Sequence, residues 1–184
     1  MQAHPGCTFD EAHPDAAVAA GTASVSEFVT PANARMIRFQ TFQSDASPAV
    51  HDLDMFVYRA APAAGSPYVE VLVSGGPDAN EVATSTSTGS LAAGAKFKVY
   101  VFGCGVDAGG GSFTLFAWGL STTPSDAFTA VPAAQAVTVG QGIDTTFGWT
   151  SLAPGNRYLG RVQYVDTADP ATAMATTVME VSTR

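Results

Sequence analysis

Charge is scarce in this chain, and positive charge is the scarcer kind. Only 13% of the 184 residues are charged, with eight Lys and Arg against sixteen Asp and Glu, so the formal net charge is −8. A chain of this charge repels a phosphate backbone at long range, so nucleic acid is excluded as an expected partner. Long apolar runs are also lacking, and the sequence therefore predicts no membrane-spanning helix.

The residues that perform acid–base catalysis are few. The histidines are His4, His13 and His51, and no Gly-x-Ser-x-Gly motif occurs. A serine peptidase needs a nucleophile, a general base and an orienting carboxylate in one constellation, and the sequence offers no set that matches. We therefore predict that this chain is not an enzyme.

Cysteine is limited to Cys7 and Cys104. Scarce lysine and abundant Ser, Thr and Gly suit an exported protein, whose thiols can pair. We predict a Cys7–Cys104 disulfide that ties the N-terminal arm to a hairpin loop; two unpaired buried thiols are the alternative. The expected localisation is secreted or at the cell surface.

What the chain does have is period-two alternation, and the clearest case is the segment from Asp52 to Tyr58. Leu53, Met55 and Val57 alternate there with acidic and aromatic residues. Successive side chains of a strand point to opposite faces, so this pattern predicts a strand with one face in a core.

Similar patterns recur along the chain and predict further strands. Residues 35–42 should point Ile37 and Phe39 inward, and residues 68–74 are expected to do the same with their valines. Residues 96–102 and 112–118 flank a Gly-rich turn and are predicted to pair as a hairpin. Short strands, Gly/Pro/Asn/Asp turns and no helical period favour an all-β fold, an antiparallel β-sandwich of jelly-roll or Ig-like type. The inward valines are Val69, Val71 and Val73.

The chain is predicted to divide into four parts. Residues 1–21 lack a sustained period and are interpreted as a solvated polar arm, followed by a first β-sandwich at 22–120. A Ser/Thr/Pro-rich linker at 121–126 leads to a second, smaller β-sandwich-like module at 127–184. Five strands are expected in the second module, one of them at 136–139.

Two carboxylates of the central strand are candidate calcium ligands. Asp52 and Asp54 share one face, and calcium binds six to eight oxygen atoms at relaxed geometry, so Asp45 or the pair Asp10 and Glu11 would have to contribute. The competing interpretation is that both acids bond neighbouring backbone N–H groups and begin the strand. Calcium is the only cofactor that the sequence suggests.

Aromatic rings occur on the strand faces opposite the predicted core. Such a set is larger than a monomer normally exposes, so it is either covered, in part by the second module, or open as a polymer-binding strip, or used for self-assembly. The candidate binding surface consists of Tyr58, Tyr100, Phe102 and Trp118. The rest of the set is Phe56 and Phe116.

Several segments together carry a resemblance to a known family. The strand Asp-Leu-Asp-Met-Phe-Val-Tyr at 52–58, the turn Leu-Ala-Ala-Gly at 91–94, the strand at 96–102 and the Gly-rich segment ending Ser-Phe-Thr-Leu at 112–115 resemble the bacterial pre-peptidase C-terminal domain. Residues 147–164 resemble the fibronectin-type-III-like tail of secreted subtilisin-like serine peptidases.

The resemblance implies a non-catalytic C-terminal accessory region of a secreted bacterial peptidase that assists stability, secretion or substrate binding. Its partners would be its own catalytic domain or an extracellular polymer or protein. The alternative is an independent extracellular adhesion or assembly module.

Overall fold

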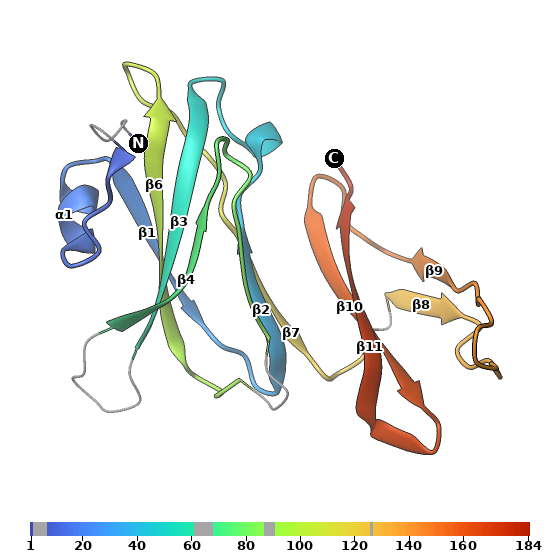
Figure 1. The fold of residues 1–184 in the computed structure, drawn as a ribbon. Helices are drawn as coiled ribbons and strands as arrows, with labels where there is room; N and C mark the ends of the chain where they lie inside the picture. Colours follow the sequence, from blue (N-terminus) through green and yellow to red (C-terminus); the bar gives the residue numbers. More distant parts are fainter. Residues whose placement is uncertain (2–6, 61–67, 87–90, 126) are drawn as a thin grey trace. The chain divides into compact units, whose positions relative to one another are not determined.

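A computed structural model describes residues 1, 7–60, 68–86, 91–125 and 127–184 (Figure 1). The chain divides into two compact units, Met1–Ser121 and Thr122–Arg184. Both are built from antiparallel strands, which confirms the predicted all-β class. Among the described residues, no helix is long and apolar enough to cross a membrane.

Unit 1 is a sandwich of two sheets. We name them sheet A, with the strand order β1-β6-β3-β4, and sheet B, with the order β5-β2-β7. Sheet A contains β1 (Ala23–Val29), β6 (Lys96–Val106), β3 (Val50–Ala60) and β4 (Tyr68–Gly75). Sheet B contains β5 (Val82–Thr86), β2 (Ala34–Gln40) and β7 (Phe116–Ser121). A short helix α1 (Pro14–Ala19) precedes β1, and a 3-10 turn η2 (Gln43–Asp45) follows β2.

The main core lies between sheets A and B, as the alternation predicted. Leu53, Met55 and Val57 of β3 are fully buried and meet Ile37 and Phe39 of β2 in one cluster. The inner face of β6 supplies Phe97, Val99 and Val101 to the same cluster. Burying an aliphatic or aromatic side chain of this size contributes roughly 1.5–3 kcal/mol, so this layer holds the two sheets together.

The prediction for β4 was wrong about which face is inward. Val69, Val71 and Val73 are 55%, 44% and 53% exposed, whereas Leu72 packs against the core opposite Val57. The register between β3 and β4 shifts after Val57, and β4 is an edge strand of sheet A. The shift places Leu72 on the core face and Tyr68 on the outer face, so period two does not hold through β4.

The predicted hairpin of residues 96–102 and 112–118 is also wrong. β6 pairs with β1 and β3, while β7 crosses to the other sheet and pairs with β2, where Arg38 lies opposite Trp118. Residues 107–115 form the connection that lets the chain change sheets. In the Ig order the first two strands pair, but here β1 and β2 lie in different sheets, so the order is not that of an Ig domain.

The N-terminal segment is not the solvated arm that the sequence predicted. Helix α1 begins with Pro14, whose fixed backbone angle suits a first helical turn, and it buries Ala17. Ala17, Phe9 and Val18 pack on the outer face of sheet A in a second apolar cluster. We call the described residues 7–21 the arm, and this cluster the arm cluster.

Unit 2 consists of two strand pairs. β8 (Phe128–Val131) pairs with β9 (Thr146–Trp149), and β10 (Arg157–Asp166) pairs with β11 (Asp169–Ser182). The predicted strand at 136–139 is absent, because these residues form a loop. Phe128 stacks on Phe147 with ring centroids 5.7 Å apart.

Candidate functional site

Sheet A carries large aromatic side chains on its outer face as well as apolar ones on its inner face. Phe56 lies opposite Tyr100, and Asp54 lies opposite Phe102, on the paired strands β3 and β6. Tyr58, one position further along the same face of β3, lies opposite Lys98. The face therefore presents a continuous group of rings with acidic and basic side chains at its two ends.

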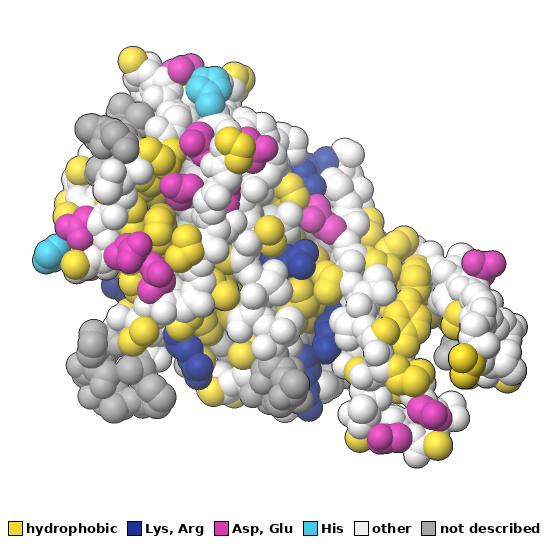
Figure 2. Space-filling model, in the orientation of Figure 1, with side chains coloured by type: hydrophobic (Ala, Val, Ile, Leu, Met, Phe, Trp, Pro, Cys, Tyr) yellow, Lys and Arg dark blue, Asp and Glu magenta, His cyan; other side chains and the backbone are white. Residues whose placement is uncertain are grey.

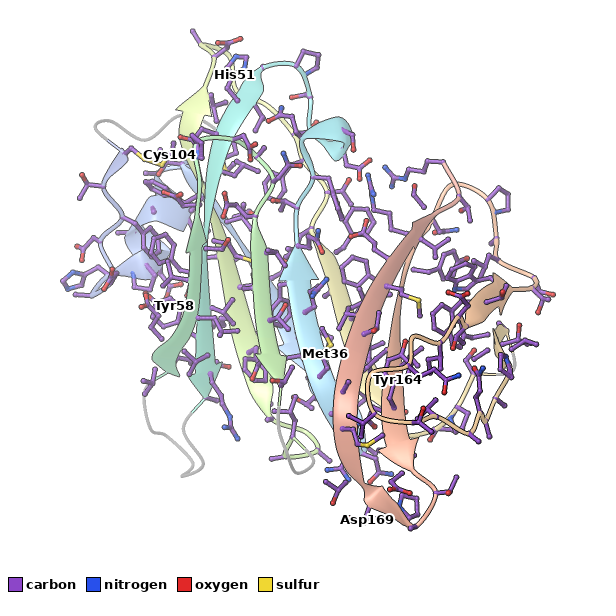
Figure 3. The ribbon with its side chains drawn as sticks, turned by 45° about the vertical axis from the view of Figure 1, so that its right-hand side comes forward. Met36, His51, Tyr58, Cys104, Tyr164 and Asp169 are labelled. Carbon is purple, nitrogen blue, oxygen red and sulfur yellow. A yellow bond between two sulfur atoms is a disulfide. The ribbon has the colours of Figure 1, made fainter. Side chains whose placement is uncertain are left out.

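The arm covers these rings. Phe9 stacks on Phe56 with centroids 4.2 Å apart and meets Phe102 edge-on at 5.3 Å. The disulfide between Cys7 and Cys104, across 97 positions of sequence, fixes the start of the arm to β6. Figure 3 shows Cys104 and Tyr58 on the arm side of sheet A. The predicted disulfide is thus present, although Cys104 lies within β6 rather than in a hairpin loop.

The arm changes what the predicted binding surface can do. Tyr58, Tyr100 and Phe102 are only 6%, 2% and 0% exposed, so they do not form an open strip. Of the alternatives that the sequence left open, the exposed strip is thus wrong for these three residues; they are covered, by an arm that the sequence interpreted as solvated. Trp118 lies on β7 of sheet B, where it stacks on Phe116 at 5.6 Å, and does not join the other three.

A small cavity remains where the arm meets the tyrosines. Its volume is about 220 Å³, and it lies wholly within unit 1. The floor is formed by three tyrosines of β3, β4 and β6, together with Lys98, and the arm supplies the wall. The lining residues are Glu11, Ala12, Pro14, Asp15, Tyr58, Tyr68, Lys98 and Tyr100.

Hydrogen bonds fix both the floor and the wall of the cavity. The Tyr100 hydroxyl donates to Asp15 Oδ1 at 2.7 Å, and the Tyr58 hydroxyl donates to the carbonyl oxygen of Glu11 at 3.3 Å. The Lys98 ammonium lies over the ring of Tyr68, 5.2 Å from its centroid. Each tyrosine of the floor is therefore held by a polar or charged neighbour.

The electrostatic field around the cavity is negative. Burial and the adjacent Glu70 carboxyl raise the pKa of Tyr58 to about 12. Burial and the hydrogen bond to Asp15 raise the pKa of Tyr100. The pKa of Glu70 is raised by burial and by the charge of Glu11. Each of these groups is harder to ionise, first because burial disfavours its charged form and then because acidic groups lie beside it.

The predicted calcium ligands lie at the other end of the same face. Asp54 Oδ2 is 2.8 Å from Cys104 Sγ and 3.7 Å from Cys7 Sγ. Burial, followed by the charge of Asp52, raises the pKa of Asp54. The pKa of Asp52 is raised by burial and by Asp78. The two acids thus share a site that resists ionisation, and a divalent cation would relieve it.

The donors available to a cation differ from those expected. Among the described residues, the group whose donor atoms lie within 4.8 Å of one another is Cys7, Asp52 and Cys104, and its two sulfur atoms form the disulfide. Both oxygens of Glu81 accept hydrogen bonds, from the hydroxyl of Ser74 and from the N–H of Gly76. Among these described side chains, the carboxylate oxygens that remain for calcium are those of Asp52 and Asp54.

Asp10, one of the acids that the sequence proposed as a further ligand, has other partners. Asp10 instead bonds His13 and the backbone of Ala12, whereas Asp78 is the acid whose charge acts on Asp52. Asp52 Oδ1 is a buried oxygen that has no hydrogen-bond partner among the described residues.

Sequence reasoning missed most of the cavity. Tyr68 and Lys98 lie in strands for which the sequence predicts no binding role, and Asp15 lies in the segment that it predicts to be a solvated arm. One signal was present: Phe9 and Val18 are the large apolar residues in an arm of otherwise small or polar residues, and both pack on the sheet together with Ala17. Pro14 followed by an alanine-rich run also fits a short helix start.

Comparison of the chain with known proteins found no matching family model, no matching curated protein and no matching solved structure.

Proposed function

We propose that this chain is a non-catalytic C-terminal accessory region of a secreted bacterial subtilisin-like peptidase, and that it assists stability, secretion or substrate binding. A larger β-sandwich followed by a smaller β unit agrees with the order of a pre-peptidase C-terminal domain and a fibronectin-type-III-like tail. The partners would be the peptidase's own catalytic domain or an extracellular protein or polymer.

The observation that carries the proposal is the disulfide-anchored arm over sheet A. Disulfides persist in oxidising compartments, so a Cys7–Cys104 bond favours a secreted or cell-surface protein. The arm also forms a cavity from side chains of four segments, and concave sites with a few placed polar groups are the usual form of a binding site. A binding role at the start of an accessory region would bring substrate to an enzyme.

The test uses the complete reading frame. An accessory role requires a catalytic domain upstream, and a reading frame without one would contradict the proposal. The region is then deleted from the parent enzyme, and kcat/KM is measured on a folded protein substrate and on a short peptide. A lower kcat/KM on the protein with an unchanged kcat/KM on the peptide supports substrate binding, and a lower Tm of the catalytic domain supports a stabilising role. No change in kcat/KM, Tm or secreted yield would rule the proposal out.

A second candidate is an independent extracellular assembly module, and the edge strand β4 favours it. Its exposed valines, Val69, Val71 and Val73, lie along an edge where another strand can pair. Assembly predicts a concentration-dependent mass in sedimentation analysis, abolished by Val71→Lys, with Val139→Lys in unit 2 as the control. A monomer at every concentration would exclude self-assembly.

A further inference from the structure

The cavity under the arm combines aromatic walls with carboxylates. Tyr58, Tyr68 and Tyr100 provide the rings, and Glu11 and Asp15 provide negative charge from the arm. Glu70, which lies opposite Tyr58 on the paired strand β4, places a third carboxylate next to the cavity. Rings and carboxylates together attract an organic cation, because the negative face of the ring and the negative charge act in the same direction.

The protein itself places a cation against this wall. The Lys98 ammonium stands over the ring of Tyr68 at 5.2 Å, within the roughly 6 Å range of a cation–π interaction. Lys98 offsets one of the two carboxylates that line the cavity, so the lining keeps a net negative charge. Figure 2 shows acidic side chains gathered on the part of unit 1 where the arm and sheet A lie.

The size of the cavity limits the ligand. About 220 Å³ is below the roughly 300–1,000 Å³ of pockets that enclose drug-sized molecules. A single extended side chain with a cationic end fits this volume, whereas a folded peptide segment does not. The geometry therefore favours one side chain of a longer peptide, inserted from solvent beneath the arm.

We propose that the cavity between the arm and the tyrosines of sheet A binds the guanidinium or ammonium group of an arginine or lysine side chain in an extended peptide. The carboxylates of Glu11 and Asp15 neutralise the cation. The rings of Tyr58 and Tyr68 contact the flat face of the guanidinium or the methylene groups of the side chain. This deepens the substrate-binding part of the proposed function by naming what the region would recognise.

The inference predicts that two charge substitutions change the affinity for a cation in opposite directions. Asp15→Asn keeps an acceptor for the Tyr100 hydroxyl but removes one negative charge, so binding of a cation should weaken roughly tenfold. Lys98→Gln removes the competing positive charge, so binding should strengthen severalfold. A ligand held by shape or by ring stacking alone would not respond in opposite directions to these two changes.

The experiment titrates the full 184-residue chain with N-acetyl-arginine amide and follows the tyrosine ring resonances by NMR. N-acetyl-citrulline amide, which is neutral and of similar shape, and maltotriose serve as comparison probes. Asp144→Asn in unit 2 and Lys96→Gln on the same strand as Lys98 are the matched charge controls. Urea unfolding and the amide spectrum establish that each variant is folded.

Support consists of saturable shifts at Tyr58, Tyr68 and Tyr100 that the citrulline probe does not cause. The affinity read from these shifts should decrease with added salt, fall in Asp15→Asn and rise in Lys98→Gln. Equal binding of both amides, binding of maltotriose alone, or no shift at tens of millimolar arginine amide would each overturn the inference. A parent peptidase that loses activity on proteins when the region is deleted, yet whose region binds no cation, would leave the proposed function standing without this ligand.

Discussion

Breaking the disulfide should remove a large part of the stability of unit 1. The perturbation is Cys7→Ala with Cys104→Ala. Alanine is chosen because a serine hydroxyl at position 104 would lie beside the Asp54 carboxylate and gain a hydrogen bond. The bond joins residues 97 positions apart, for which the chain-entropy model gives roughly 4.7 kcal/mol at 25 °C. Residual structure in the unfolded chain lowers this value, so we expect a loss of about 3–5 kcal/mol.

The assay is urea unfolding of unit 1 by near-UV circular dichroism, with and without a phosphine reductant. Reductant should lower the unfolding free energy of the wild type to that of the double variant, and should leave the variant unchanged. The released arm should also uncover Phe56 and Phe102, so a hydrophobic dye should bind before global unfolding. Unfolding free energies that agree within about 1 kcal/mol between the oxidised wild type and the variant would refute the reasoning.

Three more predictions concern the outer face of sheet A. Phe9→Ala removes the ring stacked on Phe56 and should lower the free energy of unfolding in urea by about 2 kcal/mol. The loss is smaller than for a fully buried Phe because Phe9 is only partly buried, and no loss would mean that the arm does not pack in solution. The pKa of Asp54 is raised above its ordinary 3.8 by burial, so its contribution to stability is present at low pH and is lost as the pH rises through the folded pKa. We expect Tm to fall as the pH rises above about 3.8, and Asp54→Asn to flatten that fall; an unchanged slope would contradict the assignment. Calcium added to chelated protein should raise Tm, and Asp52→Asn should abolish the rise; no shift in the wild type would exclude the predicted calcium site.

The sequence specified the inner faces of the central strands well. In β3 and β6 the apolar set is flanked by strands on both sides, so period two and burial coincide, as Leu53 and Val99 show. In β4 the same alternation misled, because the register shift after Val57 puts Leu72 on the core face and Tyr68 on the outer face, so residues of one parity do not share a face along this strand. Val71 is the extra residue at this shift and is exposed, whereas Leu72 lies opposite Val57 and packs against the core.

Local sequence patterns did not predict which distant strands pair. A Gly-rich turn is compatible with a hairpin, yet β7 pairs with β2 because the connection is long enough to change sheets. The cavity was missed for a related reason. Its residues come from the arm, β3, β4 and β6, and only the packing of Phe9 and Ala17 on sheet A brings Asp15 beside Tyr100.

The disulfide also determines how the molecule would bear mechanical load. A pull applied ahead of Cys7 passes through the covalent bond to Cys104 on β6, and the arm carries none of it. β6 pairs with β1 through residues 96–102 and with β3 through residues 97–106, so Cys104 lies beyond the pairing with β1. Tension therefore enters β6 at the end that pairs with β3, and the tyrosine cavity keeps its walls until that end separates from β3.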